Sequence, residues 1–164
     1  MSIALFRVDE RLIHGQVVVG WGNQLHPRRI VVVDDGLAGS AWEQELYTMG
    51  LPPELVTEFV NVDGAREGLR TWRSRPEVVI LLTRNVETMR RLGGGGALAG
   101  EEVNIGGIHH TPGRQEFLPY VFLSESERQE LRALADEGAH VSARDLPTTR
   151  KVTLEQLLPP EHRP

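Results

Sequence analysis

Short apolar runs of strand length alternate with stretches of helical length along nearly the whole chain, which is typical of a parallel sheet joined by helical crossovers. The predicted strands cover residues 3–8, 29–33, 57–62, 78–82, 103–105, 117–123 and 140–143. The predicted helices cover residues 15–25, 40–49, 63–73, 86–92 and 124–137, with a short one over 153–158. We therefore predict an α/β fold: a single domain with a mostly parallel sheet of about seven strands and helices on both faces. The last one or two strands are expected to run antiparallel.

Residues at the ends of the predicted helices carry capping signals. Ser124, with Glu127 three residues later, has the spacing of a capping box. Asn85 and Asp63 are expected to be N-caps. The glycine run 93–96 follows a helix but lacks the Lys-Ser/Thr pair of a P-loop, so we expect a flexible turn there.

Composition places the chain among ordinary globular proteins and argues against several classes of function. With 40% hydrophobic and 25% charged residues among 164, we expect one domain over residues 1–158 and a C-terminal tail at 159–164. The formal net charge of −5 argues against binding to nucleic acid, which needs a basic surface. The sequence shows no cysteine, no signal peptide and no apolar stretch of bilayer length, so a cytoplasmic protein is expected.

The turn from the first predicted strand to the first helix carries the main chemical signal of the chain. Residues 7–17 read Arg-Val-Asp-Glu-Arg-Leu-Ile-His-Gly-Gln-Val, which puts His14 where a helix N-terminus offers unpaired N–H groups to an anion. Arg11 lies one turn earlier and can donate a charge-assisted hydrogen bond. Gly15 and Gln16 open the helix and are expected to bind phosphate. A nucleophilic imidazole beside a phosphate site indicates a residue that carries a phosphoryl group.

The two carboxylates beside this histidine have different expected roles. Asp9 could hold one imidazole tautomer and leave the other nitrogen for attack, or it could only form a surface ion pair, and the sequence leaves both open. Glu10 is expected to form a surface ion pair with Arg7 or Arg11. For His14 itself, the alternative is a helix-start histidine that is bonded to a nearby carbonyl and has no catalytic role.

A second glycine-containing segment, residues 104–114, is predicted to form the other wall of the site. Ligands collect at the carboxyl ends of parallel strands, and this segment should leave the sheet on the same edge as the histidine turn. Gly106 and Gly107 would let the chain approach the phosphoryl group, while His109 and Arg114 would face it or an incoming partner. We expect some atom of this segment within about 8 Å of the imidazole. The alternative is an ordinary connection whose glycines only serve a turn.

Residues 34–35 and 83–84 follow predicted strands on the same edge and should be neighbours of this site. No metal site is predicted, because none of the six histidines forms an i, i+4 pair with another. No other cofactor is expected either. His109 is adjacent to His110, whose role the sequence leaves open.

The string at residues 7–17 closely resembles the opening motif of component IIB of the bacterial sugar phosphotransferase system, in its mannose/fructose/sorbose class. Segments 31–35, 104–109 and 123–127 resemble further parts of that family, so the resemblance covers about the first 158 residues. It implies that a histidine of a component IIA-like donor protein phosphorylates His14. The phosphoryl group would then pass to a sugar presented by membrane subunits, with which the protein would associate peripherally.

Two other functions stay open at this point. One is a regulatory phosphocarrier of the same fold that has no role in sugar transport. The other is a non-catalytic nucleotide-binding module, which is disfavoured because the first strand-to-helix turn lacks Gly-x-Gly-x-x-Gly. The sequence does not specify the sugar, the phosphorylated nitrogen, or whether the protein forms a homo-oligomer.

Overall fold

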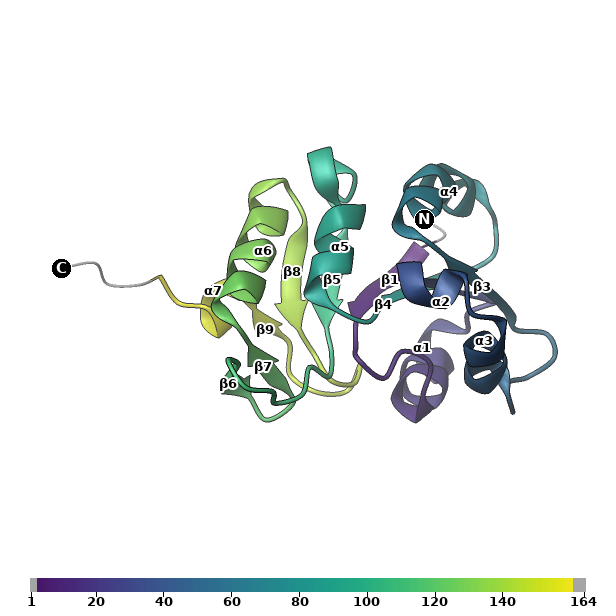
Figure 1. Ribbon diagram of the computed structural model, residues 1–164, viewed down its shortest axis with the longest axis horizontal. Coiled ribbons are helices and arrows are strands. Elements are labelled where there is room, and N and C mark those ends of the chain that lie inside the picture. The colour runs from purple at the N-terminus through teal and green to yellow at the C-terminus, as the bar shows by residue number, and fades with distance from the viewer. Residues whose placement is uncertain (1–2, 161–164) are drawn as a thin grey trace.

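A seven-stranded sheet forms the centre of the computed structural model, which describes residues 3–160 (Figure 1). Its strands are β1 (Ile3–Val8), β2 (Arg29–Val33), β3 (Val56–Val60), β4 (Val79–Thr83), β5 (Glu102–Ile105), β8 (His140–Ala143) and β9 (Val152–Thr153). They lie in the order β3-β2-β4-β1-β5-β8-β9. All neighbours pair in parallel except β8 and β9, which pair antiparallel. The predicted fold is therefore confirmed, including the antiparallel end of the sheet.

Helices cover both faces of this sheet. They are a π-helix η1 (Gln16–Trp21), α1 (Gly22–Leu25), α2 (Asp35–Ala38), α3 (Ala41–Thr48), α4 (Val62–Ser74), α5 (Val86–Leu92), α6 (Glu125–Asp136) and α7 (Leu154–Leu157). Figure 1 shows α4, α5 and α6 on one side of the sheet and α1 and α3 on the other. Within residues 3–160, no helix is long and apolar enough to cross a membrane.

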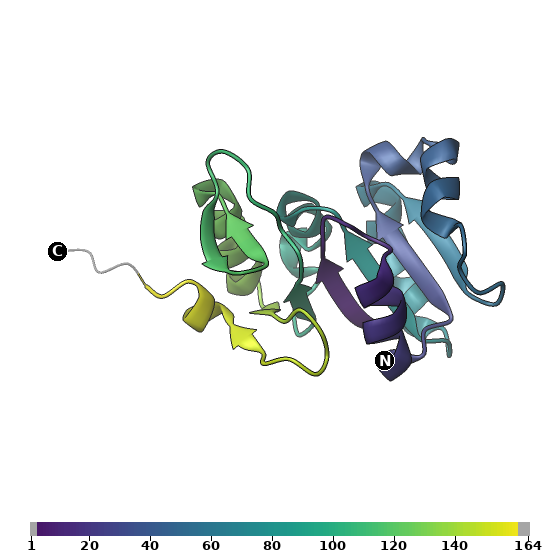
Figure 2. The same cartoon turned by 90° about the horizontal axis from the view of Figure 1, so that it is seen from below.

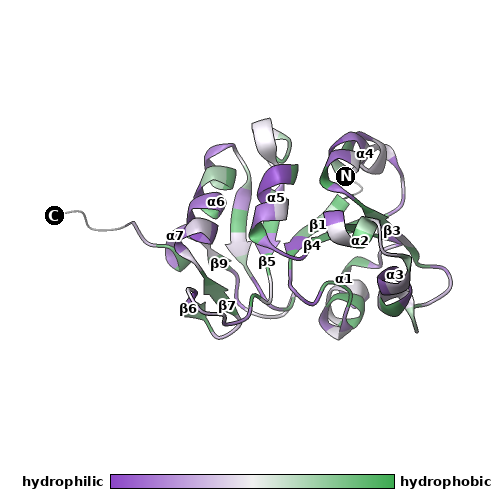
Figure 3. Ribbon diagram, viewed as in Figure 1, coloured by the Kyte–Doolittle hydropathy of each residue, from purple (hydrophilic) through white to green (hydrophobic). Residues whose placement is uncertain are grey.

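The strands bury side chains on both faces, which explains why they read as continuous apolar runs. In β2, Val31 and Val33 pack into the core under α4, α5 and α6, whereas Ile30 and Val32 pack into the core under η1 and α3. All four side chains are fully buried. Figure 3 shows hydrophobic and hydrophilic residues side by side on the helices, as expected of helices with one buried face.

The predicted strand over 117–123 is wrong. The chain there forms a hairpin of β6 (Gln115–Leu118) and β7 (Val121–Leu123), which pair antiparallel in a sheet of their own beside the main one (Figure 2). Pro119 separates the two strands, and its fixed φ and missing N–H favour a turn over a continued strand. The seventh place in the main sheet belongs instead to β9, whose two residues are too few to give a sequence pattern.

Three details of the helices refine the predictions. The capping box of Ser124 and Glu127 and the N-cap at Asn85 are confirmed. Asp63 is not an N-cap, because β3 ends at Val60 and Asn61 then accepts the N–H of Gly64 at 2.7 Å. Two short helices, α2 and the 3₁₀ turn Gly94–Gly96 within the predicted glycine turn, were not predicted.

The helix predicted over 15–25 is present as η1 followed directly by α1. Its first carbonyl, that of His14, accepts the N–H groups of both Val17 and Val18. Gly20 lies in η1 where a Cβ would come within 2.6 Å of the Leu146 side chain, so the helix packs tightly against a distant loop. Residues 161–164 of the predicted tail lie outside the described part of the chain, and the boundary at 158 stays a prediction.

Candidate functional site

The loop between β1 and η1 lies at the carboxyl edge of the sheet and is fixed to the neighbouring segments on both sides. The N–H of Asp9 donates to the carbonyl of Thr83 at 3.0 Å, and the N–H of Glu10 donates to the carbonyl of Gly107 at 2.9 Å. Leu12 is fully buried and has a φ of 56°, a left-handed conformation that is strained for a branched side chain. The loop that carries His14 is therefore held in one uncommon conformation.

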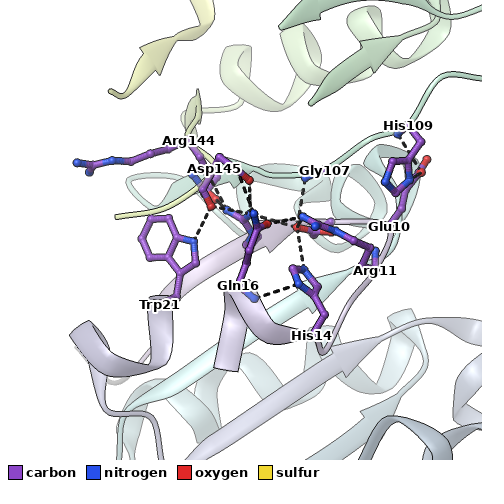
Figure 4. Close-up of polar contacts among 12 residues, drawn as sticks. Glu10, Arg11, His14, Gln16, Trp21, Gly107, His109, Arg144 and Asp145 are labelled. Carbon is purple, nitrogen blue, oxygen red and sulfur yellow. Dashed lines mark hydrogen bonds and ion pairs between the residues drawn. The ribbon is translucent and has the colours of Figure 1, made fainter. Parts of the chain in front are cut away.

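The His14 ring has a partner at each nitrogen (Figure 4). The backbone N–H of Gln16 donates to Nδ1 at 3.2 Å, and Nε2 lies 3.2 Å from Oδ2 of Asp9, at ion-pair distance. A backbone N–H can only donate, so Nδ1 must present its lone pair and Nε2 must carry the proton. The side chain is 16% exposed, so the ring is accessible only in part. The geometry thus selects the Nε2–H tautomer.

Asp9 is the centre of the charged network, and its side chain is fully buried. It accepts from the guanidinium of Arg7 at 3.1 Å, from Nε and Nη2 of Arg11 at 3.2 Å each, and from the N–H of Gly107 at 3.2 Å. Burial alone would raise the pKa of Asp9, but the hydrogen bonds from His14 and Arg11 outweigh it and hold that pKa well below its ordinary value. Asp9 is therefore a carboxylate aimed at the imidazole, not half of a surface ion pair.

Arg11 spans the space between Asp9 and the start of η1. Besides its two bonds to Asp9, its Nη2 donates to Oε1 of Gln16 at 2.5 Å. Its side chain is 36% exposed, so Arg11 is in part accessible to solvent. Next to it, a Cβ at Gly15 would meet no atom within 4 Å, which leaves the helix start sterically open.

Arg7 is a member of the network that the sequence analysis treated only as a partner for Glu10. It is fully buried in β1, and its guanidinium also bonds the side chain of Asn104 and the carbonyls of Arg144 and Asp145. Burial lowers the pKa of Arg7, although the nearby Asp9 charge opposes this. A charged residue inside an otherwise apolar strand was the signal that could have identified it.

Gly107 of the predicted wall lies close to the histidine. The N–H of Gly107 and Nε2 of His14 are each 3.2 Å from Oδ2 of Asp9, so they cannot be more than the sum of those distances apart. That separation is below the expected limit of about 8 Å, so the proximity of this segment is confirmed.

Gly106 and Gly107 also leave room for the charged network around Asp9. A Cβ at Gly106 would lie 2.7 Å from Nε of Arg7, and one at Gly107 would lie 3.0 Å from Nη2 of Arg11. The missing side chains therefore make room for two arginines that hold Asp9, and contact of these glycines with the phosphoryl group stays a prediction.

Two other residues of the predicted wall, His109 and Arg114, both bond Glu10, and we call these three residues the Glu10 clasp. Glu10 accepts from the backbone N–H and the ring of His109 at 3.0 and 2.8 Å, and from Arg114 at 2.5 Å. The expected ion pair of Glu10 with Arg7 or Arg11 is therefore wrong, because both arginines are engaged by Asp9. Arg114 also forms two bonds of 2.9 Å to Glu127 on α6. Its guanidinium is thus directed at two carboxylates, and its contact with phosphate stays a prediction.

Residues 34–35 and 83–84 lie at the ends of β2 and β4, at the carboxyl edge of the sheet, as the sequence analysis predicts. Nε of Arg84 lies 3.6 Å from Oδ2 of Asp34, which also caps α2. Asp35 accepts the N–H of Val62 and pairs with Arg91. Among residues 3–160, no group of three or more His, Asp or Glu side chains is placed to hold a metal ion.

Asp145 and Trp21 complete the network and were missed by the sequence analysis. Asp145 directly follows Arg144 at the end of β8, and its carbonyl accepts from Arg7 at 3.0 Å and from the Trp21 indole at 3.1 Å. The carboxyl-edge rule that located residues 34–35 and 83–84 applies equally to the residues after β8.

Comparison with known proteins gives one consistent result. The family model described as "PTS system sorbose subfamily IIB component" matches residues 3–163. N-acetylgalactosamine-specific phosphotransferase enzyme IIB component 1 of Escherichia coli is 29% identical over 158 residues, covering 92% of this chain and 94% of that protein. The mannose-specific EIIAB component of Escherichia coli is 30% identical over 96% of this chain, which spans only 49% of that longer protein. The crystal structure of manxB from Thermoanaerobacter tengcongensis superposes with a TM-score of 0.84 at 34% identity, covering 95% of this chain and 94% of that one.

Proposed function

Since the chain belongs to the sorbose-subfamily IIB components of the phosphotransferase system, we propose that His14 is the residue that carries its phosphoryl group. Members of this family are phosphotransferases, so the protein passes a phosphoryl group to a sugar during sugar uptake. One observation carries the assignment to His14: its ring is held by a buried carboxylate at one nitrogen and presents a lone pair at the other. A nucleophile in phosphoryl transfer needs this combination of fixed orientation and an available electron pair.

Nδ1 of His14 is the attacking atom in this proposal. It forms the new bond to phosphorus while the bond to the donor histidine breaks, and the donor nitrogen regains its lone pair. The ring of His14 then carries a positive charge with its proton still on Nε2. That proton faces the carboxylate of Asp9, which stabilises the charged ring as the phosphoryl group arrives. In the second transfer a sugar hydroxyl attacks phosphorus and releases its proton to the surrounding solvent, the P–N bond breaks, and Nδ1 regains its lone pair as the neutral imidazole.

The surroundings of Nδ1 suit a transferring phosphoryl group. The N–H of Gln16, which donates to Nδ1, is placed to donate to a phosphoryl oxygen once the lone pair is used. Arg11 bonds the side chain of Gln16, is in part accessible to solvent, and can neutralise charge on the equatorial oxygens. The open space at Gly15 leaves an approach for the partner.

The partners follow from the family. They are a IIA-type phosphodonor and the membrane subunits that present the sugar. The mannose-specific relative is an EIIAB component, so in that protein the donor and the IIB part share one chain. Relatives of this chain are specific for N-acetylgalactosamine, mannose, fructose and sorbose. This variety on one fold supports selection of the sugar by the membrane subunits, not by the surroundings of His14.

The two alternative functions find less support. A nucleotide-binding module needs a first turn whose backbone is open to a pyrophosphate, whereas here the side chains of Asp9, Arg11 and His14 fill that turn. A purely regulatory phosphocarrier would share the site chemistry, but the family to which the chain belongs acts in sugar transport.

Replacement of His14 tests the assignment. The protein is incubated with a phosphoenolpyruvate-driven phosphocarrier cascade and a IIA-type donor, and intact mass is measured under non-acidic conditions. Wild type should gain about 80 daltons, the mass of one phosphoryl group, and His14→Ala should gain nothing. His140→Ala, which removes an exposed histidine at the other end of the sheet, is the matched control and should be phosphorylated normally. A phosphorylated His14→Ala protein would overturn the assignment.

The same samples identify the nitrogen. In nuclear magnetic resonance spectra of ¹⁵N-histidine-labelled protein, phosphorus coupling should appear on Nδ1 of His14. Coupling on Nε2 would contradict the tautomer that Asp9 and Gln16 select.

A further inference from the structure

Asp145 contacts the site with both its backbone and its side chain. Its carbonyl accepts from Arg7 and from Trp21, so the backbone is fixed to β1 and to η1. Its Oδ2 accepts from Nε2 of Gln16 at 3.3 Å (Figure 4). Its Oδ1 is buried 3.9 Å from Arg7 and accepts no hydrogen bond within residues 3–160. The side chain thus reaches the start of η1 from the opposite end of the chain.

The loop that carries Asp145 is itself well fixed. Thr149 closes the loop, because its Oγ1 accepts from the N–H of Leu146 at 3.2 Å and its carbonyl accepts from Arg144 at 2.7 Å. The Leu146 side chain packs against η1 at Gly20. This loop therefore holds Asp145 in one position beside Gln16.

The carboxylate of Asp145 determines which way the amide of Gln16 points. A carboxylate only accepts, so the amide NH₂ of Gln16 must face Asp145 and its oxygen must face the other way. The oxygen then accepts from Nη2 of Arg11 at 2.5 Å. If the amide turned over, its NH₂ would face the guanidinium of Arg11, and two donors would oppose each other.

We propose that Asp145 is a positioning residue for phosphoryl transfer at His14 and that it acts through Gln16, whose amide it orients toward Arg11. The proposal rests on the proposed function of His14. Within residues 3–160, Asp145 forms no hydrogen bond or ion pair with His14 itself. It keeps Gln16 and Arg11 in the arrangement that surrounds Nδ1, so its loss should slow the chemical step without weakening recognition of the donor.

The test measures the rate of phosphoryl acceptance against the concentration of the IIA-type donor. Asp145→Ala should lower kcat about tenfold, and Asp145→Asn, whose amide can turn either its oxygen or its NH₂ toward Gln16, should lower kcat by a smaller factor; both should leave KM for the donor unchanged. The amide ¹⁵N signal of Gln16 and the ring signals of His14 should shift in both variants. Asp145→Asn keeps the size of the side chain, so it decides the question if the alanine variant does not fold.

A second pair of variants isolates the route through Gln16. In a Gln16→Ala background, Asp145→Asn should have no further effect on kcat, because the group through which it acts is gone. If the two fold-changes multiply, Asp145 acts by another route, such as its contact with Arg7, and the proposal fails. It also fails if Asp145→Asn raises KM alone or changes nothing.

Two controls separate this inference from the proposed function. Glu102→Gln removes a different acidic side chain, one that pairs with Lys151 at the start of β5, and should leave kcat unchanged. His14→Ala must abolish acceptance in the same assay. If it does not, the proposed function has failed. The shift of the Gln16 signals then tests separately whether Asp145 orients Gln16.

Discussion

Asp9 keeps its negative charge although its side chain is completely buried. Two guanidinium groups, those of Arg7 and Arg11, and the N–H of Gly107 replace the water that burial removes. Together with the hydrogen bond from His14, these groups offset the cost of burying the carboxylate. Asp9 can then respond to the charge that develops on the imidazole without rearranging its surroundings.

Arg11 is expected to contribute to the rate in proportion to the hydrogen bonds it can form. Arg11→Ala removes charge-assisted bonds of about 1.5–3 kcal/mol, which corresponds to a rate of acceptance lower by about 10- to 150-fold. Arg11→Lys keeps the charge but loses the planar guanidinium that bonds both Asp9 and Gln16, so it should slow acceptance by a smaller factor.

Single-turnover rates of phosphorylation measure this effect. Arg28→Lys, at an exposed arginine just before β2, is the matched control and should react at the wild-type rate. Equal rates for wild type, Arg11→Lys and Arg11→Ala would remove Arg11 from the mechanism.

At the scale of elements, the β1–η1 loop depends on the segment that follows β5. The two are joined by backbone bonds from Glu10 to Gly107 and from Gly106 to Val8. Gly106 lies against the buried guanidinium of Arg7, which four other residues hold in place, so Arg7 cannot move aside cheaply. The close approach of these two segments therefore requires glycine at position 106.

Gly106→Ala should destabilise the fold because its Cβ would overlap Arg7. Overpacking of a buried site costs about 1–3 kcal/mol, and displacement of a buried charge places this variant at the upper end. Urea unfolding measures the loss. Gly39→Ala, at a glycine whose Cβ would meet nothing within 4 Å, is the control and should change the free energy of unfolding by less than about 0.5 kcal/mol. A Gly106→Ala protein as stable as the control would show that the segments separate more easily than their packing indicates.

At the scale of the whole molecule, one edge of the sheet collects every group of the site. The loops after β1, β4, β5 and β8 all start there, and the residues joined at this edge are up to 138 positions apart in sequence, as in the bond from Arg7 to the carbonyl of Asp145. The Glu10 clasp ties this edge to α6, because Arg114 bonds both Glu10 and Glu127. The wall at 104–114 is thus fixed at its near end by Asp9 and at its far end by Glu10.

Because of the Glu10 clasp, the free energy of unfolding should depend on pH under acidic conditions. Burial alone would raise the pKa of Glu10, but hydrogen bonds from His109 and Arg114 lower it below the ordinary value of 4.5. A carboxylate with a lowered pKa stabilises the fold fully above its unfolded value and loses that stabilisation as pH falls through its folded value. Glu10→Gln should therefore lower the free energy of unfolding by about 1 kcal/mol at pH 7, or about 2–4 °C in Tm.

Thermal unfolding of both proteins between pH 7 and pH 3 checks this dependence. The difference between wild type and Glu10→Gln should be constant down to about pH 4.5 and should shrink below it. A difference that persists unchanged at pH 3 would mean that Glu10 stabilises the wall by packing and not by its charge.

The sequence by itself determined the features that depend only on residues close together along the chain. Runs of apolar side chains predicted six of the seven strands of the main sheet, and Ser124 with Glu127 predicted a helix start, because these patterns act over a few residues. The short string around His14 predicted a histidine at a strand-to-helix turn with an arginine beside it, since both belong to one local turn.

Only the tertiary structure decided the partners of the charged groups. Glu10 could reach several arginines by sequence distance, and it pairs with Arg114 because Asp9 already engages Arg7 and Arg11. Asp145 reaches the site from the far end of the chain. Local periodicity specifies which face of an element is buried, whereas the choice among distant polar partners depends on how sheet order and loop packing bring them together.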